Sequence, residues 1–356
     1  MAYSSISKPG LHFSSLLYTG SDGTSAISGV GFQPDWTWIK CRSHGGGDAF
    51  ENVLTDAVRG VNKTLVSDDS DAEATNNATG YLSVFSSDGF TVTGGDAVNG
   101  VARTYASWNW KANGQGSSNT DGSINTTYTS VNAAAGLSIV KYAATGSNAT
   151  VGHGLSAVPK MILVKQLNTA RDWAVYHTSM GNGNYMNLNV NGQSTSSSTH
   201  WNSTTPTSSV FSIGTSNQTN ENGNDYIAYC FAEKKGYSKI GGYTGNGNAN
   251  GPFIYTGFKP AFVMIKVKSG NNNHWFLFDK NRLGYNNGNS GNEYLKADGN
   301  DAESTNTNRI NIFSNGFKCT TSNDGVNGNT DTYIYWAIAE EPLVANVGQS
   351  IPATAR

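Results

Sequence analysis

The 356-residue sequence contains little charge and little cysteine. Charged residues make up 13% of the chain and the net charge is -2, which excludes the basic surface that binding to nucleic acid or an anionic membrane requires. The three cysteines are far apart and form no CxxC pair, so a disulfide framework and a zinc knuckle are excluded too. No run of 18 apolar residues and no secretion signal is present. We therefore expect a soluble protein that is not exported, does not insert into membranes and keeps its cysteines as buried thiols.

The residues that are abundant favour strands and turns. Glycine occurs 42 times, and Asn, Ser and Thr crowd the same stretches. These residues are typical of turns and polar strand faces. The 8 Trp, 17 Tyr and 14 Phe supply large rings for hydrophobic cores. The composition predicts an all-β protein with long loops.

Two motifs occur three times in the same order. The first is a glycine, a turn proline and an apolar run that ends in lysine. It reads GFQPDWTWIK at 31–40, GLSAVPKMILVK at 154–165 and GFKPAFVMIK at 257–266. About 70 residues after each proline comes an alternation of aromatic and aliphatic residues, namely TYASWNWKA from Thr104, DYIAYCFAE from Asp225 and TYIYWAIAE from Thr332. A period of two predicts strands with one buried face.

The triplication predicts three tandem antiparallel β-sandwiches of jelly-roll or lectin-like type. We name them the first, second and third repeat. The expected divisions are an N-terminal arm (1–15), the first repeat (16–112), a polar linker (113–134), the second repeat (135–235), the third repeat (236–341) and a C-terminal tail (342–356).

Acidic loops in the first and third repeats are candidate calcium ligands, because calcium prefers hard oxygen donors. The candidates are Asp68, Asp71, Glu73, Asp298, Asp301 and Glu303. The matching loop of the second repeat has no carboxylate, so calcium is an optional ligand and a turn-capping role is the alternative. The pairs Asp56-x-x-Arg59 and Asp279-x-x-Arg282 precede these loops and predict salt bridges that fix a turn.

No catalytic constellation is evident. The six histidines occupy non-equivalent positions, and no GxSxG elbow occurs. Glu221, Glu233 and Glu293 are available to a glycosidase, but nothing in their neighbourhoods marks them. We therefore predict a protein that is not an enzyme and requires no metal or cofactor.

Trp201 is the candidate contact residue for a surface glycan. Trp173 and Trp275 occupy matching places in two repeats, which indicates core anchors. Trp201 has no counterpart and lies among Ser, Thr and Asn, which favours an exposed aromatic side chain that stacks on a sugar.

Long strings such as SWNWKANGQGSSNTDGSINTTYTSVN and IAYCFAEKKGYSKIGGYTGNGNANG resemble an uncharacterised domain family found in virion proteins of marine tailed bacteriophages. The resemblance covers nearly the whole chain from about Ile6 and brings no catalytic residues with it. It implies a virion protein that is assembled in the host cytoplasm and binds other virion subunits. Fibres in general suggest a homo-oligomer, with a trimer as the expected form.

Two candidate functions follow from this resemblance, and a third is independent of it. We expect an exposed tail-fibre or spike component that contacts a glycan or protein of the host surface. The family strings begin almost at residue 1, where a fibre would have an adaptor and a shaft, so a capsid-decorating head fibre or cement protein is the alternative. A carbohydrate-binding module is the third candidate.

Overall fold

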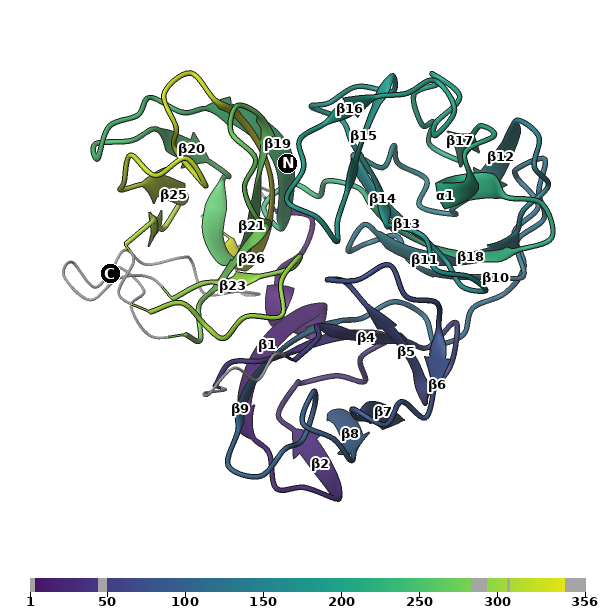
Figure 1. Ribbon diagram of the computed structural model, residues 1–356, viewed down its shortest axis with the longest axis horizontal. Coiled ribbons are helices and arrows are strands. Elements are labelled where there is room, and N and C mark those ends of the chain that lie inside the picture. Colours follow the sequence, from purple (N-terminus) through teal and green to yellow (C-terminus); the bar gives the residue numbers. More distant parts are fainter. Residues whose placement is uncertain (1–3, 44–49, 283–292, 306–307, 343–356) are drawn as a thin grey trace.

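The computed structural model describes residues 4–43, 50–282, 293–305 and 308–342 (Figure 1). These residues form antiparallel strands, one 3-10 helix, η1 (Pro9–Leu11), and one short α-helix, α1 (Asn217–Asn220). The predicted all-β antiparallel fold is confirmed. The predicted tail lies outside the described residues, apart from Pro342 at the end of the last strand.

The first repeat contains a six-stranded and a three-stranded sheet. The large sheet has the order β1-β9-β3-β4-β5-β6, and the small sheet has the order β2-β8-β7. The strands are β1 (Phe13–Thr19), β2 (Thr24–Ser28), β3 (Trp36–Cys41), β4 (Val53–Asp56), β5 (Lys63–Val66), β6 (Ala74–Thr75), β7 (Tyr81–Ser86), β8 (Gly89–Thr93) and β9 (Thr104–Trp110).

The second repeat contains a seven-stranded sheet, β10-β11-β18-β13-β14-β15-β16, and the pair β12-β17. Its strands are β10 (Tyr128–Asn132), β11 (Leu137–Ala143), β12 (Ala149–Gly152), β13 (Met161–Gln166), β14 (Ala174–His177), β15 (Asn184–Asn187), β16 (Thr195–Ser196), β17 (Val210–Ile213) and β18 (Asp225–Phe231). Because β10 lies inside the predicted linker 113–134 and pairs with β11, that segment is part of a sandwich and not only an extended connector.

The third repeat contains a five-stranded sheet, β19-β26-β21-β22-β23, and a three-stranded sheet, β20-β25-β24. Its strands are β19 (Ser238–Thr244), β20 (Phe253–Tyr255), β21 (Phe258–Ser269), β22 (Phe276–Asp279), β23 (Leu295–Lys296), β24 (Ile310–Phe313), β25 (Gly316–Cys319) and β26 (Thr332–Pro342).

The same pair of stacked tyrosines ties the opening and closing strands of every repeat. The ring centroids lie 5.0, 5.4 and 4.9 Å apart in Tyr18–Tyr105, Tyr142–Tyr226 and Tyr243–Tyr333. In each pair both hydroxyls donate to backbone carbonyls of the segment just before the closing strand. The sequence triplication is therefore a structural triplication as well.

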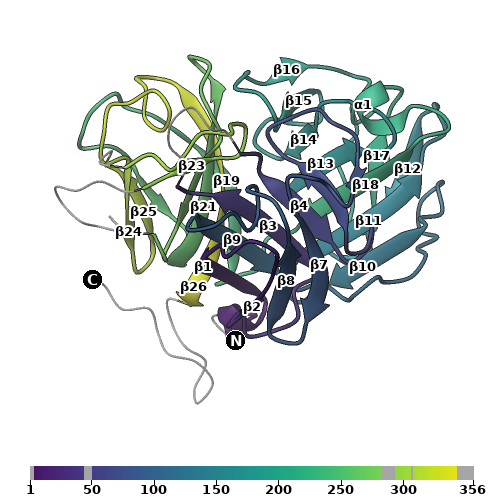
Figure 2. The same ribbon diagram turned by 60° about the horizontal axis from the view of Figure 1, so that its bottom comes forward.

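The three repeats meet around one centre and share a hydrophobic core (Figures 1 and 2). The central strands are buried on both faces. In β3, Trp36 and Trp38 belong to the shared core, while Ile39 and Cys41 belong to the interior of the first sandwich. The expectation of one buried face was wrong for the closing strands β9, β18 and β26, which are also buried on both faces, because the neighbouring repeats cover the face that a lone sandwich would expose to water.

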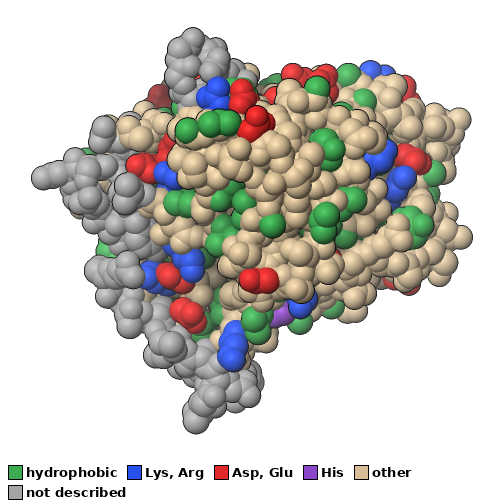
Figure 3. All heavy atoms as spheres, turned by 90° about the horizontal axis from the view of Figure 1, so that it is seen from below, with side chains coloured by type: hydrophobic (Ala, Val, Ile, Leu, Met, Phe, Trp, Pro, Cys, Tyr) green, Lys and Arg blue, Asp and Glu red, His purple; other side chains and the backbone are tan. Residues whose placement is uncertain are grey.

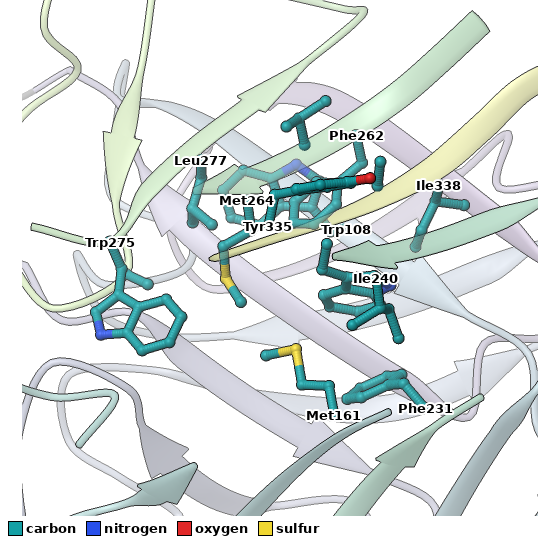
Figure 4. Packing of buried hydrophobic residues seen from close by; sticks show 14 of the residues in the cluster. Trp108, Met161, Phe231, Ile240, Phe262, Met264, Trp275, Leu277, Tyr335 and Ile338 are labelled. Carbon is teal, nitrogen blue, oxygen red and sulfur yellow. The ribbon is translucent and has the colours of Figure 1, made fainter. Parts of the chain in front are cut away.

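Aromatic rings from all three repeats stack in this core. Trp36 stacks on Trp110 at 4.2 Å and on Tyr229 of the second repeat at 4.6 Å, and Trp110 stacks on Trp336 of the third repeat at 5.6 Å. Figure 4 shows the continuation of this packing, with Trp108, Met161 and Phe262 contributed by different repeats. The burial of so many large rings holds the repeats together without a disulfide.

Candidate functional site

The loops that carry the candidate calcium ligands lie at the junctions between repeats. Lys40, Lys165 and Lys266 end the first motif of each repeat, and all three are fully buried. Their Nζ atoms donate to carbonyl oxygens of Gly299 at 3.1 Å, Ser70 at 3.0 Å and Asn191 at 2.8 Å, respectively. Each acceptor is in the loop of another repeat, so the contact runs cyclically around the molecule. Burial lowers the pKa of each of the three lysines to about 8.

A second cyclic set of contacts strengthens the same junctions. The Nε1 atoms of Trp173 and Trp275 donate to Val66 O at 2.7 Å and Asn187 O at 3.0 Å, each in the preceding repeat. At the third junction the Nδ2 of Asn52 donates to Gly299 O at 3.0 Å. The prediction that both tryptophans are core anchors is confirmed.

The loop carboxylates bind protein groups. Asp68 and Asp298 accept backbone N–H groups of Asn52 at 2.8 Å and Trp275 at 2.9 Å, which lie 16 and 23 positions away, so neither bond is a local turn cap. Three more carboxylates form ion pairs, namely Glu73 with Arg59 at 3.2 Å, Asp301 with Lys296 at 2.9 Å and Glu303 with Arg42 at 2.6 Å. The sixth candidate, Asp71, is exposed to solvent. Among the described residues, no three His, Cys, Asp or Glu side chains form a group that could hold a metal ion. The six candidates are therefore not assembled into one coordination shell.

The two predicted Asp-x-x-Arg salt bridges are present and completely buried. Arg59 Nε lies 2.5 Å from Asp56 Oδ2, and Arg282 Nε lies 2.7 Å from Asp279 Oδ2. The same two carboxylates also accept hydrogen bonds from neighbouring repeats. The hydroxyl of Tyr229 donates to Asp56 at 2.7 Å, and the indole of Trp108 donates to Asp279 at 3.0 Å. The pairs therefore join repeats in addition to fixing turns.

Trp201 is buried, contrary to the expectation of an exposed contact residue. Only 1% of its surface is accessible, and its ring packs edge-to-face on Tyr176 at 5.7 Å inside the second sandwich. The polar neighbours in the sequence misled the prediction, because the loop folds over the sandwich and turns the single large ring inward. Trp201 cannot stack on an external sugar without unfolding this loop.

The glutamates considered for hydrolysis lie in separate ion pairs. Glu221 pairs with Arg171 at 3.2 Å, Glu233 with Lys239 at 3.3 Å and Glu293 with Arg42 at 3.3 Å. Burial together with the nearby Glu303 raises the pKa of Glu293 to about 7. The three cysteines are buried free thiols, as predicted.

Exposed aromatic side chains gather in one place among the described residues. Phe253, Tyr255 and Phe313 are exposed by 45%, 55% and 37%, and all three belong to the small sheet β20-β25-β24 of the third repeat. The rings of Phe253 and Phe313 meet edge-to-face at 6.0 Å. We call these three residues the aromatic platform. Sequence analysis missed it, although the alternation in PFIYTG already placed two aromatic residues on one strand face.

A solvent-open hollow of about 320 Å³ adjoins the aromatic platform. Tyr255 lines it together with Thr256 and the charged residues Glu233, Lys235 and Lys239. Its volume lies at the lower end of the range for small-molecule sites, about 300–1,000 Å³. The platform and the hollow together are the candidate functional site.

The described residues form an all-β protein of antiparallel sheets with an exposed aromatic surface on the third repeat. The chain belongs to the family described as a domain of unknown function, DUF7483, whose model matches residues 8–342. No curated protein and no solved structure matches the chain. None of the described helices is long and apolar enough to cross a membrane.

Proposed function

We propose that this protein is a non-enzymatic structural component exposed on a bacteriophage particle, in the role of a tail fibre or spike that contacts the host surface. The observation that carries the proposal is that the repeats share one buried core, while the aromatic platform is exposed on an outer sheet. Buried strand lysines donate to loop carbonyl groups of other repeats and hold the repeats together, and the exposed aromatic rings of the described residues lie on one outer sheet. The resemblance of long strings to tailed-phage virion proteins supports the same role.

The surface character agrees with a passive structural role. In Figure 3 most of the visible face belongs to uncharged polar side chains and backbone, with charged side chains in small, scattered groups of both signs. Such a surface resists nonspecific attraction to nucleic acid and membranes. The chain places three similar sandwiches around one centre, an arrangement that a trimeric fibre tip forms from three chains.

A capsid-decorating role is the second candidate, and the compact arrangement favours it. The repeats surround a common centre instead of following one another along a shaft (Figures 1 and 2). This shape suits a subunit that sits on a lattice of other virion subunits better than it suits the shaft of a fibre.

Immunogold labelling of intact particles with antibody against the purified protein tests both roles. Label at the tail tip supports the fibre or spike, and label spread over the head supports decoration instead. Particles that bind no antibody, while the purified protein does, would contradict a place on the virion surface. The native mass of the purified protein is the companion measurement, because a stable homotrimer favours a fibre and a monomer favours decoration.

A further inference from the structure

We propose that the aromatic platform and its adjoining hollow bind an oligosaccharide. This inference rests on the proposed function and deepens it, since it gives the chemistry of the contact. The platform comprises Phe253 and Tyr255 on β20 and Phe313 on β24. The small sheet of these strands lies on the outer side of the third repeat, where Figure 1 labels β20 and β25.

The first repeat is an internal control for this surface. In the strand register Phe253 pairs with Lys318, and Tyr255 and Phe313 both pair with Gly316. The corresponding pairs of the first repeat place Ala26 opposite Thr91, and Ser28 and Ser86 opposite Gly89. Ala26, Ser28 and Ser86 therefore occupy the places of the three platform residues. The same sheet forms without any aromatic residue there, so the fold does not require the platform.

Gly316 lets the rings meet at the middle of the sheet. A Cβ atom at this position would lie 2.9 Å from the Cζ of Phe253 and 2.1 Å from the carbonyl oxygen of Ile254. Since no side chain fits between them, Phe253 and Phe313 approach each other across the glycine at 6.0 Å. The result is a low apolar surface bordered by the polar residues Asn311 and Lys318.

The size of the platform favours a saccharide over a protein. An aromatic side chain has roughly 150–250 Å² of surface. At the exposures of 37–55% the three rings offer roughly 300 Å². A stable protein interface needs about 800 Å² from each partner. A sugar ring needs far less, because its C–H face lies flat on the negative face of one aromatic ring.

The hollow supplies the polar partners that a saccharide also requires. Tyr255 belongs to both the platform and the hollow, so a chain stacked on the rings extends to Glu233 and Lys239. These two side chains form an ion pair at 3.3 Å, in which the carboxylate offers hydrogen-bond acceptors and the ammonium group offers donors. A few placed polar groups beside an apolar surface are the usual composition of a small-ligand site. With Lys235 the lining of the hollow carries two ammonium groups and one carboxylate, which suits the hydroxyl and ring oxygens of an oligosaccharide.

The test compares the wild-type protein with a triple variant on an array of bacterial surface oligosaccharides, followed by calorimetry with the strongest binder. The variant Phe253→Ala, Tyr255→Ser, Phe313→Ser carries the residues of the first repeat, so it is expected to fold. We expect the wild-type protein to bind an oligosaccharide and the variant to lose at least about tenfold in affinity, at an unchanged melting temperature. Val101→Ala, which trims an exposed side chain of the first repeat, is the matched control and leaves affinity unchanged.

Two results would overturn the inference. One is that no array oligosaccharide binds the wild-type protein at millimolar concentration, or that binding survives in the triple variant. The other is that sedimentation reveals self-association of the wild-type protein that the triple variant lacks, which would make the platform an interface between copies. Immunogold labelling keeps the two proposals separate, because a labelled particle without sugar binding removes only this inference. Sugar binding without a labelled particle removes only the virion role.

Discussion

The indole Nε1 of Trp108 donates a hydrogen bond of 3.0 Å to Oδ2 of Asp279, which lies 171 positions later in the chain. The same oxygen accepts the Nε of Arg282 at 2.7 Å, and all three side chains are buried. One carboxylate therefore neutralises a buried guanidinium and joins the first repeat to the third.

Asp279→Ala is expected to lower the free energy of unfolding by about 3–5 kcal/mol, because it leaves the buried Arg282 charge without its partner. Urea denaturation followed by tryptophan fluorescence measures the loss. Asp301→Ala is the matched control, since its salt bridge with Lys296 is more than half exposed on the acidic side and contributes at most about 1 kcal/mol. Equal losses in the two variants would contradict the structural role of Asp279.

The repeat pattern made much of this architecture predictable. Each motif lysine and each closing tyrosine marks an equivalent position, so three pairs of sheets follow from the sequence. The shared core could not be predicted from the sequence. Both faces of β3 and of β18 carry apolar residues, and this pattern does not reveal which face a neighbouring repeat covers. The repeats share an interior at their boundaries, where Trp36 of the first repeat stacks on Tyr229 of the second.

The candidate site was less predictable, for a physical reason. Trp201 and Phe253 both lie in polar stretches, and no local pattern distinguishes a ring that turns inward from one that points outward. Only the strand register, which places Phe253 opposite Lys318 on the outer face, resolves the difference. The acidic loops are similar, because Asp68 and Asp298 bind backbone groups 16 and 23 positions away, and Glu303 pairs with Arg42 of another repeat.

Lys165→Met tests the buried lysines through their pH dependence. The pKa of Lys165 is lowered from 10.5 to about 8 in the folded state, so between pH 8 and 10.5 the unfolded chain binds more protons at this position. The lysine therefore contributes more favourably to stability as pH rises through this window, by up to about 1.4 kcal/mol per pH unit. The measurement is the difference in unfolding free energy between wild type and Lys165→Met from pH 7 to 10. A difference that is flat across this range would contradict the prediction.

His177 is expected to make the protein sensitive to acid. Its Nδ1 accepts the N–H of Ser179 at 3.1 Å, so the proton is on Nε2, which donates to the carbonyl of Tyr335 in the third repeat at 3.3 Å. Burial lowers the pKa of His177 from 6.5 to about 4. Between these values the unfolded chain binds more protons, so stability falls as pH decreases from 6.5 to 4, by up to about 3 kcal/mol. Acid unfolding curves of His177→Gln should be flatter over this range, and an NMR titration that places the pKa of His177 near 6.5 would contradict the argument.

Trp201 is expected to matter for stability and not for binding. Trp201→Ala removes a fully buried ring that packs on Tyr176, which costs about 3–5 kcal/mol. Trp201→Phe should cost less, about 1–2 kcal/mol, because none of the described residues is a hydrogen-bond partner of the indole nitrogen and only part of the packing is lost. Thermal and urea unfolding give the two values, with oligosaccharide binding measured in parallel on the folded Trp201→Phe protein. Unchanged stability of Trp201→Ala together with lost sugar binding would contradict the burial of Trp201 and indicate that its side chain is exposed.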